Sequence, residues 1–155
     1  MSEIITIELL RPDDKEAIEF CVNYISSAWG YTQEEARSRL SESHFCLVAR
    51  INNSPIGMVA LFPRTKLQTD GTYEPWAAGL YVTEQHRHIG IGQRLQKEML
   101  KQARLKGYPA VYMATDNEPL KLWYHRAGWK VVGKGWENDH TYDVFAFDLK
   151  KELNL

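Results

Sequence analysis

Hydrophobic and polar residues recur along the chain with two different periods, and each change of period marks an expected element. Short runs rich in β-branched and aromatic residues predict strands over residues 4–10, 45–51, 56–62, 76–82, 110–114, 129–132 and 142–149. Apolar residues at helical spacing predict helices over about residues 14–29, 32–40, 90–106 and 117–126. The order β-α-α-β-β-β-α-β-α-β-β predicts an α/β fold, a mixed sheet flanked by helices.

Local signals set several of these ends. Thr32 with Glu35 three residues later is a capping box, which starts a helix, and Gly30 is a plausible stop for the helix before it. The turn residues at 52–55, Asn-Asn-Ser-Pro, separate two strand-like runs. We therefore expect these two runs to form an antiparallel hairpin.

Two polar segments are predicted to connect strands. Residues 63–75 form a polar stretch that is longer than a typical connection, so we expect a functional loop at the border of a cleft. The last two strands are joined by a polar segment that contains Gly133, Gly135, Asn138 and Asp139.

Composition narrows the class of protein. The size of the chain predicts one domain over residues 1–155. The 19 basic and 20 acidic residues are interspersed, so neither a nucleic acid nor a membrane surface is an expected partner. Cys21 and Cys46 stand in apolar patterns and are expected to be reduced core residues, which fits the cytoplasm. The sequence leaves open whether the chain is a monomer or a homodimer.

One stretch, residues 80–95, predicts a phosphate-binding site. A strand ends at Val82, and Gly90 and Gly92 shape the turn that opens a helix, so backbone N–H groups should point outward there. Arg87 adds a fixed positive charge. Neither a Walker loop nor a dinucleotide fingerprint fits the residues that follow. The alternative is that the two glycines only shape the turn.

Two motifs in this half of the chain resemble those of the GNAT N-acetyltransferase superfamily. Arg87-x-x-Gly90-x-Gly92, directly after a strand, resembles the family's acyl-CoA pyrophosphate loop, (Gln/Arg)-x-x-Gly-x-(Gly/Ala). The run from Asn117 to Trp129 matches Asn-x-x-(Ala/Leu)-x-x-Phe-Tyr-x-x-x-Gly-(Phe/Tyr/Trp), with Trp123 in place of Phe. The resemblance is close in the second half of the chain and rests only on element order in the first.

The resemblance implies that an amine attacks the thioester of acetyl-CoA directly, without a metal. The pyrophosphate would bind the loop at residues 87–92, and the pantetheine arm would pair with the backbone of Leu80 and Val82. Tyr124 would protonate the leaving thiolate as general acid, and Asn117 would orient the CoA arm. The implied CoA-binding residues are Leu80, Tyr81, Val82, Arg87, His88, Ile89, Gly90, Ile91, Gly92, Gln93, Asn117, Leu120, Trp123 and Tyr124.

Structural roles compete with some of these assignments. Tyr124 could be an aromatic core residue, and Asn117 could be a helix N-cap. His86, His88 and His125 show no zinc-ligand spacing, so they are expected to be loop or surface residues, although His88 could touch a phosphate.

The sequence does not fix the general base. Histone-acetylating members of the family carry a glutamate six residues before the position of Val82, and this chain has Trp76 there. Glu74 would lie on the same strand face if the strand extended, which makes it the first candidate base. The alternatives are that Glu74 is a solvated loop residue and that water accepts the proton.

The acceptor is expected beside Trp29, Tyr31, Glu74 and Trp76, in an aromatic and weakly acidic mouth that suits an amine. Arg64 and Lys66 in the loop at residues 63–75 argue the other way, since they suit an acceptor with both an amine and a carboxylate. We expect a small-molecule amine, with a protein or peptide amine as the alternative. Two further alternatives are an acyl-CoA sensor without turnover and an interaction domain that binds no nucleotide.

Overall fold

The computed structural model of the protein describes residues 4–150, so the ends of the predicted 1–155 domain lie outside the described residues. A single mixed sheet of eight strands forms its centre, in the order β1-β2-β3-β5-β6-β8-β7-β4. The strands are β1 (Ile5–Leu9), β2 (Phe45–Ile51), β3 (Ser54–Phe62), β4 (Gln68–Thr69), β5 (Trp76–Val82), β6 (Ala110–Thr115), β7 (Lys130–Glu137) and β8 (His140–Asp148). The helices are α1 (Lys15–Trp29), α2 (Gln33–Ser41), the short 3-10 helix η1 (Glu84–His86), α3 (Ile91–Leu105) and α4 (Glu118–Arg126). The predicted α/β class is confirmed, and β4 and η1 are additions to the predicted order.

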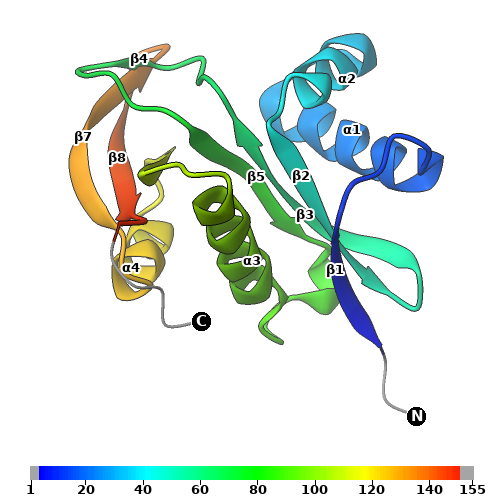
Figure 1. The fold of residues 1–155 in the computed structure, drawn as a ribbon. Helices are drawn as coiled ribbons and strands as arrows, with labels where there is room; N and C mark the ends of the chain where they lie inside the picture. Colours follow the sequence, from blue (N-terminus) through cyan, green and yellow to red (C-terminus); the bar gives the residue numbers. More distant parts are fainter. Residues whose placement is uncertain (1–3, 151–155) are drawn as a thin grey trace.

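The two faces of the sheet are covered by different helices (Figure 1). α1 and α2 pack on one face, against alternate residues such as Cys46, Val48 and Met58. α3 packs on the other face, against Leu47 and Leu61. Both faces of β2 are therefore buried, which explains why its sequence is almost continuously apolar instead of alternating.

Helix ends follow the local signals that the sequence carries. Thr32 and Glu35 form the predicted capping box: each side chain accepts a hydrogen bond from the other residue's backbone N–H, at 3.0 and 2.9 Å. Gly30 ends α1 in the left-handed conformation, with φ of 69°. These ends depend on neighbours in the sequence, so they were readable from it.

The early hairpin is confirmed, but its turn is tighter than predicted. β2 and β3 pair antiparallel around Asn52 and Asn53, which both have positive φ, at 49° and 73°. Ser54 and Pro55, predicted to lie in the turn, belong to β3. Pro55 is accommodated next to the bulge between Ala49 and Arg50, where regular pairing is already interrupted.

The prediction for the last two strands was wrong about the segment between them. β7 continues through Gly133 and Gly135 to Glu137, and only Asn138 and Asp139 form the turn to β8. The loop at residues 63–75 packs on the strand at both glycines, tightly at Gly133 and less so at Gly135, where an added Cβ would lie 3.2 Å from the Leu67 side chain. At Gly133 an added Cβ would collide with Tyr73 and Asp70.

The loop at residues 63–75 was predicted to be irregular, and part of it is the strand β4, which pairs with β7 at the far edge of the sheet. The chain therefore leaves β3, reaches across to β7 and returns to β5 (Figure 1). Asp70 fixes this loop: its carboxylate accepts hydrogen bonds from the Tyr73 hydroxyl at 2.8 Å and from Lys134 N–H at 3.1 Å.

Cys21 and Cys46 are buried and free, as predicted, with their sulfur atoms 3.9 Å apart. Within residues 4–150, none of the helices has the length and apolar character needed to cross a membrane.

Candidate active site

The sheet opens in its middle, between β5 and β6. These strands run parallel, and within the described residues they pair only at Trp76 and Tyr112, where β5 begins. Beyond this point the backbone of β5 on its β6 side has no strand partner in the ladder. An unpaired parallel edge of this kind can hydrogen bond to an extended ligand as an added strand would.

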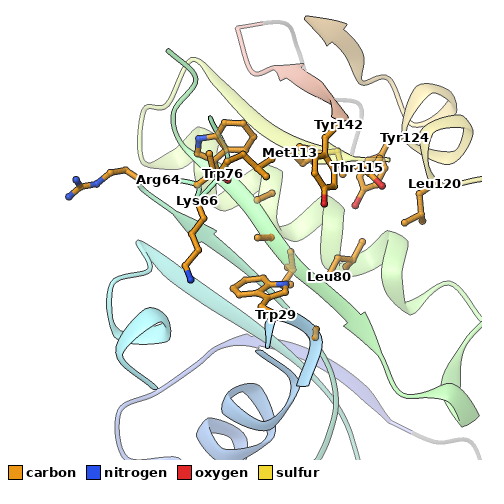
Figure 2. Close-up of a pocket in the computed structure, with 18 of the residues that line it drawn as sticks. Trp29, Arg64, Lys66, Trp76, Leu80, Met113, Thr115, Leu120, Tyr124 and Tyr142 are labelled. Carbon is orange, nitrogen blue, oxygen red and sulfur yellow. Dashed lines mark hydrogen bonds between the residues drawn. The ribbon is translucent and has the colours of Figure 1, made fainter. Parts of the chain in front are cut away.

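A cavity of about 490 Å³ occupies the opening between these strands. Its wall is built from β5, β6, α1, the loop at residues 63–75 and the start of α4, and Figure 2 shows side chains from these elements converging on it. Its volume lies within the range of small-molecule sites. The loop at residues 63–75 supplies Arg64, Thr65, Lys66 and Leu67, so the predicted border of a cleft is confirmed.

β5 carries a bulge beside the cavity. Met58 pairs with Tyr81 and Ala60 with Ala78, so Gly79 and Leu80 together oppose Val59. Gly79 has φ of 72°, a conformation that side chains with a Cβ rarely adopt, and both Gly79 and Leu80 line the cavity. The bulge was not predicted, although a glycine inside a strand pattern is its usual signal.

Tyr124 lies at one end of the cavity, on α4 (Figure 2). It is 7% exposed, and its ring packs edge-on against Trp123 and Trp129, with centroids 4.9 and 5.4 Å apart. Burial raises its pKa, and Tyr24 across the cavity adds to the shift. The phenol therefore keeps its proton well above the ordinary tyrosine pKa of about 10. Tyr124 is both a core aromatic and a cavity residue.

The N-terminus of α3 has the geometry of an anion site. The helix begins after Gly90, which has φ of 88° and provides no side-chain cap. A Cβ added at Gly90 or at Gly92 would meet no atom within 4 Å, so the space in front of the first N–H groups is open. Arg87 lies beside this turn, and its Nε donates to the Val82 carbonyl at 2.8 Å. The arrangement leaves free backbone donors and a fixed cation next to the unpaired end of β5.

The predicted CoA-binding residues divide into separate groups in the structure. Leu80, Leu120 and Tyr124 line the cavity. The turn residues from Arg87 to Gln93 lie outside its lining, and Ile91 is a core residue, so only its backbone faces a ligand there. His88, Ile89, Gly90 and Gln93 are exposed or half-buried around the same turn.

Three of the predicted CoA-binding residues have structural roles and do not line the cavity. Asn117 is the N-cap of α4, since its side chain accepts a hydrogen bond from Leu120 N–H at 3.0 Å. Trp123 packs against the core beside Tyr124. The Tyr81 ring stacks on Tyr24 at 4.2 Å, with the α1 core.

The acceptor side contains three of the four predicted residues. Trp29, Tyr31 and Trp76 line the cavity, and Trp29 meets Tyr31 edge-on with centroids 6.0 Å apart. Glu74 is exposed and is not among the residues that line the cavity. β5 begins at Trp76, so Glu74 lies outside the strand, and the strand periodicity that would have turned its side chain toward the site does not apply.

The cavity also contains polar residues that the sequence analysis did not single out. Glu137 at the end of β7 is the only acidic residue among the described cavity-lining residues, and Tyr142 on β8 stands with Thr115 near Tyr124 (Figure 2). Gln96 on α3 is 5% exposed, lines the cavity, and its side-chain nitrogen has no hydrogen-bond partner in the described part of the chain. Glu137 and Tyr142 reach the site through long-range strand pairing, which no local pattern reports.

Histidines do not gather into a metal centre. His86 accepts or donates a hydrogen bond with the Thr83 hydroxyl at 2.7 Å, and His88 and His125 are exposed. Among the residues that the structure describes, no three His, Cys, Asp or Glu side chains group in a way that could hold a metal ion.

The sequence matches one family model, described as the acetyltransferase (GNAT) family, over residues 8–129. Comparison with curated proteins gave no significant match.

Solved structures with the same fold are numerous. An aminoglycoside 6′-N-acetyltransferase complexed with coenzyme A is 17% identical, with a TM-score of 0.76 over 96% of this chain and 99% of the other. The aminoglycoside 6′-N-acetyltransferase from Enterococcus faecium is 15% identical, with a TM-score of 0.74 over 96% and 99%. A GNAT family acetyltransferase from Elizabethkingia anophelis with acetyl-CoA bound is 18% identical, with a TM-score of 0.65 over 93% and 97%. At these identities the likeness concerns the fold.

Proposed function

The chain belongs to the acetyltransferase (GNAT) family, whose members transfer an acetyl group from acetyl-CoA to an amine, and we propose that its acceptor is a small-molecule primary amine. The observation that carries this proposal is the cavity itself. It opens at the unpaired edge of β5, has the largely buried side chain of Tyr124 at one end and an aromatic mouth at the other, and has the size of a small-molecule site.

In this proposal the pyrophosphate of CoA binds at the N-terminus of α3. The open space at Gly90 and Gly92 lets phosphate oxygens approach the N–H groups of Ile91, Gly92 and Gln93. Arg87 is held by its bond to the Val82 carbonyl, which leaves its other N–H groups available for phosphate. The CoA arm then runs along the edge of β5 toward Leu80.

The bulge of β5 supplies the hydrogen-bond donor for the negative charge that develops on the thioester oxygen. An extra residue in a strand leaves backbone groups out of the ladder, and of the two bulge residues, Gly79 and Leu80, we take Leu80 to be the one whose N–H is free. We assign to this N–H the hydrogen bond to the thioester oxygen, which becomes negative when the amine attacks. Gly79 makes the bulge possible because it accepts the left-handed conformation.

Tyr124 completes the reaction as general acid. The amine nitrogen forms a bond to the acetyl carbon, the carbon–sulfur bond breaks, and the sulfur takes the proton of the Tyr124 hydroxyl. Its raised pKa keeps the phenol protonated before attack. The tyrosinate regains a proton from water or from the acetylated nitrogen as the products leave.

The attacking amine must first lose a proton, and Glu74, Glu137 and water are the candidate acceptors. Glu137 lines the cavity and Glu74 does not, which favours Glu137 or water over the residue first suggested by the sequence. Paired variants separate the three. Glu137→Gln should lower kcat/KM most at acidic pH if Glu137 is the base, whereas profiles of both Glu137→Gln and Glu74→Gln that overlay the wild type assign the role to water.

The test of the function is acetyl-CoA binding by calorimetry together with thiol release across a panel of primary amines. We expect saturable binding and amine-dependent release of free CoA thiol. Binding without thiol release for every amine would identify a sensor, and no binding at all would identify an interaction domain. Transfer to peptide amines in preference to every small amine would contradict the proposed acceptor class.

A further inference from the structure

The charged side chains of the cavity have an uneven distribution. Arg39 on α2 and Arg64 and Lys66 on the loop at residues 63–75 all line it, against the single carboxylate of Glu137. Figure 2 shows Lys66 beside Trp29, on the opposite side of the cavity from Tyr124 and Tyr142. Glu137 comes from the end of β7, next to Trp136, which pairs with Gln68 of the same loop, but within the described residues it forms no salt bridge with Arg64 or Lys66. The cationic side chains that line this mouth therefore outnumber its one carboxylate.

The charge of Arg39 is already compensated within the protein. Its Nη2 donates to the Arg64 carbonyl at 2.6 Å, and its Nη1 lies 3.7 Å from a carboxylate oxygen of Glu42. Its guanidinium also lies over the Phe62 ring, 4.4 Å from the centroid. Arg39 thus serves to hold the backbone of the loop at residue 64, and it offers less charge to a ligand.

Arg64 and Lys66 have no such compensation. Neither forms a salt bridge with a residue in the described range 4–150. The Lys66 ammonium lies over the Tyr31 ring, 3.7 Å from the centroid, which keeps it at the wall of the cavity. The pKa of Glu35 is lowered mainly by the hydrogen bond that its carboxylate accepts from the Thr32 backbone N–H in the capping box of α2, and Lys66 only adds to that shift.

A ligand in this mouth would meet the exposed ammonium of Lys66, while Arg64, whose side chain extends away from the other labelled residues in Figure 2, adds a more distant positive charge. A second positive charge on the acceptor would be repelled there, and a carboxylate would be attracted. Resting on the proposed transfer to an amine, we propose that the acceptor is an amine that carries an anionic group at its far end, and that amines with a second positive charge are poor acceptors. The aromatic wall of Trp29, Tyr31 and Trp76 holds the apolar body between the two ends.

The test compares acceptors that differ only in the charge of the far end: ε-aminocaproate, hexylamine and hexamethylenediamine. A para-substituted benzylamine trio with carboxylate, hydrogen and aminomethyl groups repeats it on a rigid body. We expect kcat/KM to fall in the order anionic, neutral, dicationic, with about a tenfold difference between the first and last. Equal values, or a preference for the dication, would overturn the inference while leaving the transferase function in place.

Charge-reversal variants assign the effect to the two side chains. The double variant Arg64→Glu, Lys66→Glu should lower kcat/KM for ε-aminocaproate relative to hexylamine and raise it for hexamethylenediamine relative to hexylamine, so that the order of preference reverses. Lys101→Glu, which reverses an exposed charge on α3 outside the cavity, is the matched control and should leave all three acceptors unchanged. The same order of preference in the double variant as in the wild type would overturn the inference.

If no amine releases thiol, the proposed function fails, and the charge preference is then read by calorimetric titration of the three acceptors into protein saturated with CoA. Tighter binding of ε-aminocaproate than of hexamethylenediamine, lost in the double variant, supports an anion-accepting mouth. Equal binding of the two overturns it.

Discussion

At the scale of single residues, the proposed phosphate binding depends on the glycines at the start of α3, and the proposed protonation of the thiolate depends on the hydroxyl of Tyr124. Gly90 and Gly92 differ in an important way. Gly90 has φ of 88°, so any side chain strains the backbone there, whereas Gly92 has no positive φ and an added Cβ meets open space. Gly92 is therefore the position where ligand binding can be tested without disturbing the fold.

Gly92→Asp should weaken acetyl-CoA binding by roughly a hundredfold, since it brings a carboxylate to the place where a phosphate approaches the backbone. Calorimetry measures the affinity and thermal unfolding checks the fold. Gly92→Ala adds the Cβ without the charge and tests the steric part alone. If the aspartate variant binds acetyl-CoA as tightly as the wild type, the pyrophosphate does not bind at this helix.

Tyr124→Phe should lower kcat by about ten- to a thousandfold with little change in acetyl-CoA affinity, because it removes one proton donor and keeps the packed ring. The raised pKa of Tyr124 adds a second expectation. The wild-type rate should not fall as the pH passes the ordinary tyrosine pKa of about 10, since the phenol stays protonated there. Wild-type turnover in the variant would assign protonation of the thiolate to another group.

At the scale of elements, the bulge of β5 is the feature that we expect to place a free backbone N–H group beside the thioester. Gly79→Ala places a Cβ at φ of 72° and 3.2 Å from the Met58 methyl carbon, and should cost about 1–2 kcal/mol of stability. It should also lower kcat by about a hundredfold, because the N–H of Leu80 would no longer point at the thioester oxygen.

Gly107→Ala is the control for that prediction. Gly107 has φ of 90° after the end of α3, and an added Cβ meets nothing within 4 Å. It should lose similar stability in urea unfolding but keep its turnover. Equal turnover in both variants would show that the bulge does not serve the reaction.

Elements whose signals are local were readable from the sequence. The capping box of Thr32 and Glu35, the glycine that opens α3 and the spacing from Asn117 to Gly128 all depend on near neighbours. The features that were not predicted depend on contacts between residues far apart in the sequence. β4 exists because residues 68–69 pair with β7, and β7 runs through two glycines because Tyr73 and Leu67 fill the space above them.

The candidate site divides in the same way. Tyr124, Leu80 and the aromatic mouth were predicted and lie on one cavity. Glu74 was predicted from strand periodicity, which fails because β5 starts two residues later. Glu137 lies on β7, far along the chain from Glu74, and reaches the site through the pairing of β7 with β8, so nothing near it in the sequence indicates that position.

At the scale of the whole molecule, hydrogen bonds to carboxylates make the free energy of unfolding depend on pH in the acid range. Backbone N–H groups lower the pKa of Asp14, Glu35 and Asp70, and the Lys134 ammonium lowers that of Asp143. A carboxyl with a lowered pKa in the folded state stabilises the fold above its unfolded pKa, and this contribution is lost as the pH falls toward the folded value.

The free energy of unfolding in urea should therefore be nearly constant from about pH 7 to about pH 5 and should fall below about pH 4. Asp14 contributes through its bonds to Ala17 N–H and Arg50, so Asp14→Asn should reduce both the plateau and the acid slope. Asp13→Asn, which removes only an exposed contact to Arg11, is the control. An acid slope unchanged in Asp14→Asn would contradict this assignment.

The central claim, that an amine takes the acetyl group directly from acetyl-CoA in this cavity, is tested most directly by following an isotopically labelled acetyl group. We predict that the protein gains no label from acetyl-CoA alone, and that with an amine present the label appears on the amine nitrogen in step with free thiol. Label retained on the protein, or thiol release that does not depend on the amine, would contradict it.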